Sequence, residues 1–380
     1  MKKIYLDYAA ATPLDTTVLA AMEPYFSEYF YNPSATYLRG RDTKVALEEA
    51  RTSVAVTLGT KKSEIIFTSG ATEANNLAVQ GIMRNFPGGE VLVSAIEHES
   101  VLEPAKLFRH REIPVSPQGI VDKHKLEKMI STKTALVSIM MVNNELGSVQ
   151  PIHEISKIIG KLRKLRGPKE FPLYLHTDAV QAGNFLDLHV ARLGIDMMSL
   201  SGGKLYGPRQ SGALFVKSNV KLLPLILGGG QEGGLRAGTE NVAGAVGLAK
   251  ALETAQASRT EEAARLTKLR KLFATLLQKN IKSSVINGSS KHCAPHLLSV
   301  TIPNFDNERL MMELDEGGVI AAVGSACSSS SEKPSQVLAA IGLSKAEAEA
   351  TLRFSLGRGS SKNDILFTVN LLAGLTTQHR

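Results

Sequence analysis

An aspartate and a lysine stand at the ends of two successive apolar segments in the middle of the chain. Asp178 follows the segment 173–176, and Lys204 follows the segment 197–200. A lysine can hold pyridoxal phosphate (PLP) as an aldimine, while a carboxylate against the pyridinium nitrogen keeps the ring able to accept electrons. The two residues together predict PLP-dependent chemistry on an amino acid.

A single cysteine lies in a small, polar segment far downstream. Cys327 is surrounded by glycine, serine and alanine in the segment 324–331, which has no apolar periodicity that would bury a thiol. A reactive thiol is therefore favoured over a small buried hydrophobe. This indicates that sulfur is the atom being moved. Cys293 precedes another apolar segment and receives no role.

The segment 69–76 follows an apolar run and opens a helical pattern, so its small residues and amide groups meet the positive end of a helix dipole. A phosphate fits there. The alternative is an ordinary helix start, with Ser69 or Thr72 as its cap. The presence of Asp178 and Lys204 favours the phosphate.

His98 follows the apolar segment 91–94. A lone histidine is usually a capping or core residue, but its place at a strand end favours stacking on a flat cofactor and proton transfer. The glycine-rich segment 228–239 lacks the spacing of a dinucleotide fingerprint and by itself predicts a mobile loop.

Strand-like and helix-like segments alternate through the first two-thirds of the chain, which predicts an α/β fold with a mainly parallel sheet. In such sheets ligands collect at the carboxyl ends of the strands, where Thr68, Asp178 and Ser201 fall. A long helix is expected over 243–280, followed by a smaller α+β domain. The expected strands are 64–68, 91–94, 135–139, 173–176, 197–200, 212–216, 297–302 and 351–355, with a helix over 308–314.

Composition narrows the class of protein. The chain has 380 residues, of which 43% are hydrophobic and 21% charged, and a net charge of +8. No apolar run approaches the roughly 18 residues of a membrane span. An acidic residue at position 7 interrupts any signal-peptide core, and only two cysteines occur, so a reducing cytoplasmic setting is expected.

The cationic run 161–166 is expected to face water at a helix end. No nucleic-acid motif is present, so direct nucleic-acid binding is not expected, whereas an acidic protein partner stays open. No closely spaced Cys and His ligands predict a metal site.

The combination of motifs resembles the NifS/IscS-like cysteine desulfurases, PLP-dependent enzymes with the class V aminotransferase fold. The motifs that carry the resemblance span nearly the whole chain and lie at 5–13, 67–73, 97–98, 142–147, 177–181, 201–208, 236–239, 324–327 and 353–358. The resemblance implies the fold type I of PLP-dependent transferases, with a seven-stranded-type sheet. It implies a large domain over 16–249 and a small domain formed by 1–15 and 250–380, which carries a mobile cysteine loop at about 323–334.

The resemblance also implies roles for individual residues. Lys204, Cys327 and His98 would be catalytic. Asn144 and Arg353 would hold the substrate carboxylate, as the fork geometry of a guanidinium allows. The cofactor-binding residues would be Ala71, Thr72, His98, Asn144, Asp178, Gln181, Ser201, Lys204 and Thr239, the last from a second subunit of a homodimer.

The implied reaction removes sulfur from L-cysteine, leaves it on Cys327 as a persulfide and releases L-alanine. The sulfur would pass to an acceptor protein, for iron–sulfur cluster assembly or tRNA thiolation. The acceptor stays open, because the chain ends at Arg380 without the tail by which some relatives contact a scaffold protein.

One residue departs from the family pattern. Position 203, before the lysine, is usually a histidine that helps to hold the phosphate, and here it is Gly203. The alternatives are a selenocysteine lyase or another class V aminotransferase, neither of which needs Cys327, and a sulfur-trafficking scaffold subunit without catalysis.

Overall fold

The computed structural model describes residues 3–167, 169–324 and 335–378. Its largest sheet has seven strands in the order β2-β8-β7-β6-β5-β3-β4. β8 runs antiparallel to β2 and β7, and the other neighbouring strands are parallel. The strands are β2 (Ile65–Thr68), β3 (Glu90–Ser94), β4 (His110–Ile113), β5 (Thr134–Ser138), β6 (Tyr174–Asp178), β7 (Met197–Ser201) and β8 (Gly212–Val216). The predicted α/β class with a mainly parallel sheet is confirmed.

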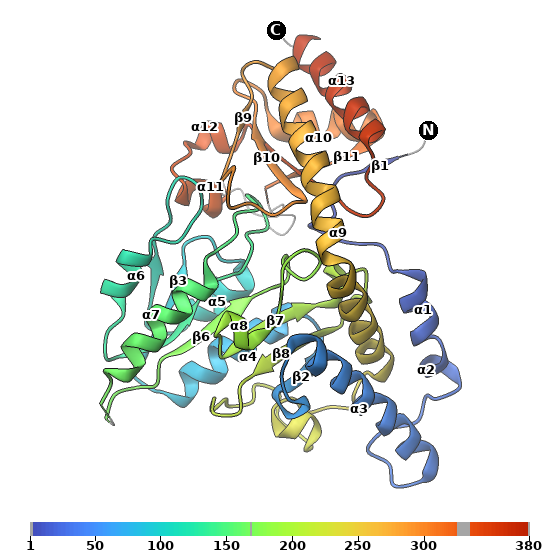
Figure 1. The fold of residues 1–380 in the computed structure, drawn as a ribbon, viewed down its shortest axis with the longest axis vertical. Coiled ribbons are helices and arrows are strands. Elements are labelled where there is room, and N and C mark those ends of the chain that lie inside the picture. The colour runs from blue at the N-terminus through green and yellow to red at the C-terminus, as the bar shows by residue number, and fades with distance from the viewer. Residues whose placement is uncertain (1–2, 168, 325–334, 379–380) are drawn as a thin grey trace.

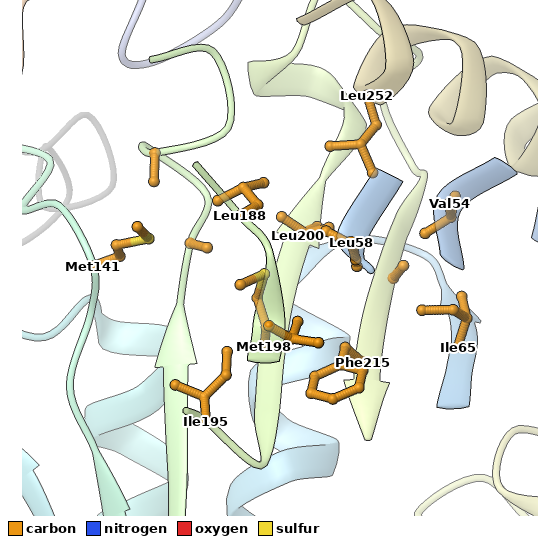
Figure 2. Close-up of a cluster of buried hydrophobic side chains, with 14 of the residues drawn as sticks. Val54, Leu58, Ile65, Met141, Leu188, Ile195, Met198, Leu200, Phe215 and Leu252 are labelled. Atoms are coloured by element: carbon orange, nitrogen blue, oxygen red, sulfur yellow. The ribbon is translucent and has the colours of Figure 1, made fainter. Parts of the chain in front are cut away.

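Helices cover both faces of this sheet, and the strand side chains alternate between two cores. Met198 and Leu200 of β7 pack with α1, α3, α7 and α9, whereas Met197 packs with α4 and α5. Figure 2 shows part of the first core, which includes Leu200 and Phe215 of the sheet and Leu58 of α3. The helices are α1 (Thr16–Met22), α2 (Pro24–Ser27), α3 (Leu38–Leu58), α4 (Ala71–Asn85), α5 (Glu99–Lys106), α6 (Lys123–Met129), α7 (Ile152–Lys164), α8 (Val190–Leu193) and α9 (Val242–Asn280).

The long helix α9 spans two hydrophobic cores. Its residues up to Ala255 pack in the core of the large sheet, and those from Leu266 onward pack in a second core that contains Leu6 and Phe354. Figure 1 shows α9 running from the large sheet to the smaller layer. The helix expected over 243–280 is confirmed. The domain division near residue 250 stays a prediction.

The smaller layer is built around a four-stranded antiparallel sheet in the order β12-β13-β10-β9. The strand β1 joins this part of the protein by pairing in parallel with β11. The elements are β1 (Ile4–Tyr5), β9 (Val285–Ile286), β10 (Leu297–Thr301), α10 (Asn307–Glu316), β11 (Val319–Ile320), β12 (Ala322–Val323), α11 (Gln336–Ala340), α12 (Lys345–Ala348), β13 (Thr351–Ser355) and α13 (Lys362–Gln378). Across the described ranges, none of the helices has both the length and the apolar character to cross a membrane.

The expectation that the cationic run 161–166 faces water is wrong for two of its arginines. Arg163 forms an ion pair with the buried Asp196. Arg166 donates hydrogen bonds to the backbone oxygens of Thr134, at 2.9 Å, and Ser131, at 2.6 Å. These arginines therefore tie the end of α7 to the amino-terminal ends of the interior strands β5 and β7, because guanidinium donors can satisfy a carboxylate and free carbonyls there.

Candidate functional site

A cavity of about 350 Å³ opens where the carboxyl ends of β6 and β7 meet the start of α4. Parallel strands bring their ends to one edge of the sheet, which is why residues distant in sequence converge there. Every predicted site residue lines this cavity, apart from Thr239 and from Cys327, which lies outside the described residues. The predicted residues in the lining are Ala71, Thr72, His98, Asn144, Asp178, Gln181, Ser201, Lys204 and Arg353.

Asp178 ends β6 and is 6% exposed. Its Oδ1 accepts a hydrogen bond from the backbone N–H of Val180 at 2.9 Å, and its Oδ2 accepts one from Nδ2 of Asn75 at 2.7 Å. Two N–H donors suit a carboxylate, which accepts only. The acid is therefore held in one orientation at the cavity wall.

Lys204 ends the short 3₁₀ helix Gly202–Lys204 that follows β7. Its Nζ donates a hydrogen bond to the backbone oxygen of Ala10, and its backbone oxygen accepts one from Nδ2 of Asn184 at 2.7 Å. The N-terminal segment therefore runs from β1, which pairs with β11, to a contact with Lys204 at Ala10. A side chain on Gly203 would meet Cγ of Arg209 at 3.7 Å, an ordinary contact, so packing does not require glycine there.

The start of α4 forms another wall of the cavity. Gly70 is the N-cap, with φ of 152°, a conformation that side chains disfavour, and within the described part of the chain the N-cap position makes no side-chain capping hydrogen bond. The predicted alternative of Ser69 or Thr72 as cap is therefore wrong. The backbone N–H of Ser69 instead donates to Oε2 of Glu73 at 2.8 Å, and Glu73 pairs with Arg236. An N-terminus without a side-chain cap suits an anion.

His98 both caps α5 and lines the cavity. Its Nδ1 accepts a hydrogen bond from the backbone N–H of Ser100 at 3.1 Å. Oγ of Ser100 lies 2.9 Å from that nitrogen, and it accepts a hydrogen bond from Nδ2 of Asn75 at 2.8 Å. One amide, that of Asn75, therefore connects Asp178 to the residues that orient the imidazole. Sequence reasoning missed Asn75 and Ser100, although both lie in or beside the motifs that it singled out.

Arg353 reaches the cavity from β13 and is 2% exposed. Its Nη2 donates to Oδ1 of Asp7 at 2.7 Å, and its Nη1 donates to the backbone oxygen of Asn144 at 3.1 Å. Its Nε is buried without a hydrogen-bond partner among the described residues. The arginine is thus fixed beside Asn144 by contacts from two other segments.

Two buried ionisable groups, Glu97 and His176, precede the cavity-lining residues His98 and Asp178 in the sequence. Burial, with a smaller contribution from the charge of Asp178, raises the pKa of Glu97 to about 8. Burial lowers the pKa of His176 to about 3, and its ring nitrogens contact the hydroxyls of Ser138 and Ser199. Glu97 is therefore protonated and His176 neutral near pH 7.

Thr239 lies in a second hollow that shares Ser69 and Gln210 with the main cavity. The glycine-rich segment that carries it was expected to be a mobile loop, and the structure corrects this for Glu232. Glu232 has a side chain only 2% exposed and accepts two hydrogen bonds from Arg51, at 2.6 and 2.7 Å. The backbone N–H of Phe67 also donates to it at 2.8 Å. The segment is anchored to α3 and β2 by a buried ion pair.

The sequence matches the family model for class-V aminotransferases over residues 4–367. The chain belongs to this family. It is 42% identical over 378 residues to a protein named cysteine desulfurase IscS from Dictyoglomus turgidum, a match that covers 98% of this chain and 94% of that protein. It is also 41% identical to cysteine desulfurase IscS 1 from Archaeoglobus fulgidus, a match that covers 99% of this chain and 97% of that protein.

Solved structures agree with this assignment. A NifS-like protein superposes with a TM-score of 0.91 at 32% identity, over 99% of this chain and all of that chain (100%). A structure titled SspA in complex with cysteine has a TM-score of 0.80 at 37% identity. The match covers 93% of this chain and 98% of that chain. The fold type I expected for PLP-dependent enzymes of this family is therefore confirmed.

The donor set fits PLP. Lys204 offers an amine, Asp178 a fixed carboxylate, and the start of α4 a helix N-terminus without a side-chain cap. These three groups match the aldehyde, the ring nitrogen and the phosphate of PLP, and all line one cavity.

Proposed function

We propose that this protein is a PLP-dependent cysteine desulfurase, which converts L-cysteine to L-alanine and transfers the sulfur to an acceptor. The observation that carries the proposal is that Lys204 and Asp178 line one cavity, at the ends of the adjacent strands β7 and β6. The full-length similarity to proteins named cysteine desulfurase supports the same activity.

When bound, PLP supplies a sink for the electrons that are released when a proton leaves the substrate α-carbon. Asp178 would hold the ring nitrogen, Gln181 the phenolic oxygen, and His98 the ring face. Ala71, Thr72 and Ser201 would hold the phosphate. Lys204 would carry the cofactor before substrate binds and then move the α-proton. Asn144 and Arg353 would orient the substrate carboxylate, because Arg353 is already fixed beside Asn144.

Cys327 would accept the sulfur. Its thiolate attacks the sulfur of bound cysteine, so an S–S bond forms as the C–S bond breaks, and the three-carbon remainder leaves as alanine once protonated. The product on the enzyme is a persulfide, which a protein of iron–sulfur cluster assembly or of tRNA thiolation would then receive.

The site would be completed by a second copy of the chain. Exposed apolar side chains gather in the segment 26–38, and Pro33 and Ser34 line a hollow together with Gly230 and Glu240, next to Thr239. A partner covering this surface would remove it from water and bring its own Thr239 into the interface. We therefore propose a homodimer in which Thr239 contributes to the partner's cofactor site.

The test is to incubate the PLP-treated protein with free L-cysteine and a thiol reductant, which releases the persulfide sulfur as sulfide, and to measure alanine and sulfide. Both products are expected, and Cys327→Ala should abolish their release. Alanine formation that survives Cys327→Ala would rule out the thiol as acceptor and favour a lyase or aminotransferase. Absence of a PLP absorption band from the protein once unbound PLP has been removed would favour the non-catalytic scaffold instead.

A further inference from the structure

His296 is a buried histidine next to the cavity to which no role has been assigned. It precedes β10 and is 3% exposed. Together with Gln181, Lys204 and Phe185 it lines a narrow hollow beside the main cavity. It therefore lies directly behind the residue proposed to contact the phenolic oxygen of the cofactor.

The contacts of His296 define its tautomer. Its Nε2 lies 3.3 Å from Oε1 of Gln181, whereas its Nδ1 is buried without a hydrogen-bond partner among the described residues. Burial lowers the pKa of His296 to about 3, and the positive charges of Arg353 and Arg270 contribute. A neutral imidazole has one N–H, and only Nε2 has an acceptor within reach. The proton is therefore assigned to Nε2, since on Nδ1 it would be a buried donor without an acceptor.

This tautomer fixes the amide of Gln181. Nε2 of His296 donates a hydrogen bond to Oε1 of Gln181. Nε2 of Gln181 in turn donates one to the backbone oxygen of Ala9 at 3.0 Å. If the amide of Gln181 were turned over, its oxygen would face the backbone oxygen of Ala9, and its N–H groups would face the N–H of His296. In the observed orientation one N–H of Gln181 goes to Ala9, and since Gln181 also lines the main cavity, we assign its second N–H to the cavity.

We propose that His296 is a positioning residue that holds the amide of Gln181 so that an N–H, rather than a carbonyl, faces the phenolic oxygen of bound PLP. Stacking on Phe185, with ring centroids 4.4 Å apart and planes at 24°, keeps the imidazole in place. This inference rests on the proposed function.

The consequence is measurable in the visible spectrum of the PLP-loaded protein. An N–H donated to the phenolic oxygen stabilises negative charge there, so the proton shared between that oxygen and the lysine nitrogen leaves at lower pH. Loss of the donor should raise the pKa of the visible band. We expect a rise of about one unit, which corresponds to about 1.4 kcal/mol.

The test is a spectrophotometric pH titration of the parent protein, His296→Leu, Gln181→Leu and the double variant, all loaded with PLP. Both single variants should raise the pKa of the band by about one unit, and the double variant no further than Gln181→Leu. His296→Gln, which keeps an N–H donor, should titrate as the parent does. His296→Phe, which keeps a ring on Phe185, serves as the second apolar variant if the leucine variant does not fold.

An unchanged pKa in the apolar His296 variants, beside a shifted Gln181→Leu, would overturn this inference and leave the proposed function intact. A shift in His296→Gln as large as in His296→Leu would also overturn it, since loss of the donor would not be the cause. A parent protein without any visible band in the presence of PLP would instead overturn the proposed function, and this inference with it.

Discussion

Single side chains at the cavity depend on partners from other elements. Nδ2 of Asn75, on α4, donates to both Asp178 and Ser100, and Ser100 contacts His98. The acid proposed for the ring nitrogen and the imidazole proposed for the ring face are therefore held by one amide. A change at Asn75 should affect both sides of the cofactor.

We predict that Asn75→Ala weakens PLP binding by about tenfold or more, because a hydrogen bond to a charged group contributes about 1.5–3 kcal/mol. Titration of the visible band with PLP measures this. Asn76→Ala is the matched control, since Nδ2 of Asn76 donates to the backbone oxygen of Thr72 within the same helix. Equal PLP affinity in the two variants would contradict the role assigned to Asn75.

Glu97 links burial to the pH dependence of stability. Its pKa of about 8 in the folded protein lies above its ordinary value of 4.5. The folded state therefore holds this proton more tightly than the unfolded state does. Protonated Glu97 contributes fully to the stability of the fold below pH 4.5, and this contribution is lost as the pH rises through 8.

We predict that Glu97→Gln, which cannot ionise, becomes progressively more stable than the parent between pH 4.5 and 8. Thermal unfolding midpoints across this range measure the effect. Glu28→Gln, at an exposed position, is the matched control for replacing one carboxylate by an amide. A difference between Glu97→Gln and the parent that stays constant with pH would show that Glu97 ionises normally.

The elements that sequence reasoning found were those with a strong local signal. The strands expected over 212–216 and 351–355 have the bounds observed, because both are fully buried and most of their residues are apolar or β-branched. The strand β4 was missed, since its sequence His-Arg-Glu-Ile is largely polar and lies at the sheet edge.

The same distinction holds for the site. Asp178 and Lys204 could be predicted, because strand ends of a parallel sheet share an edge. The contacts of Asn75, His296 and Ala10 could not, because each depends on how separate segments pack. No local pattern places Ala10 beside Lys204 or His296 behind Gln181.

The ion pair between Arg51 and Glu232 connects α3 to the glycine-rich segment. Both side chains are buried, at 9% and 2% exposed, and Glu232 adopts a left-handed conformation with φ of 48°. Breaking a buried pair leaves one charge without its partner, which costs about 3–5 kcal/mol. This segment carries Thr239, so the pair should also affect the site.

We predict that Glu232→Ala lowers the free energy of unfolding by about 3 kcal/mol. Denaturant unfolding measures it. Glu253 pairs with Lys250 at 3.3 Å on the surface, so Glu253→Ala should change the same quantity by less than about 1 kcal/mol. Similar losses in the two variants would show that the Arg51–Glu232 pair is not specially stabilising.

At the scale of the whole molecule, the proposed dimer would cover apolar side chains that the single chain exposes. Phe26 is 63% exposed, Phe30 64% and Leu38 75%. Burying such residues is favourable at about 25 cal/mol per Å². Pro33 and Ser34, which lie between Phe30 and Leu38 in the sequence, line a hollow with Gly230 and Glu240, so the proposed assembly would couple to cofactor binding through Thr239.

We predict a particle of twice the chain mass of 40.8 kDa in sedimentation or light scattering. The double variant Phe30→Glu and Leu38→Glu should shift it toward the monomer and weaken PLP binding. Phe367, exposed on α13, provides the control, and Phe367→Glu should remain dimeric. A monomeric parent that binds PLP fully would contradict the shared site.

Covalent attachment of the cofactor at one amine is the central claim. Borohydride reduction of the PLP-treated protein, followed by peptide mass spectrometry, locates that amine directly. We predict the pyridoxyl group on the peptide that contains Lys204, and its loss in Lys204→Ala. A pyridoxyl group on a different lysine of the parent, or on none, would contradict the assignment.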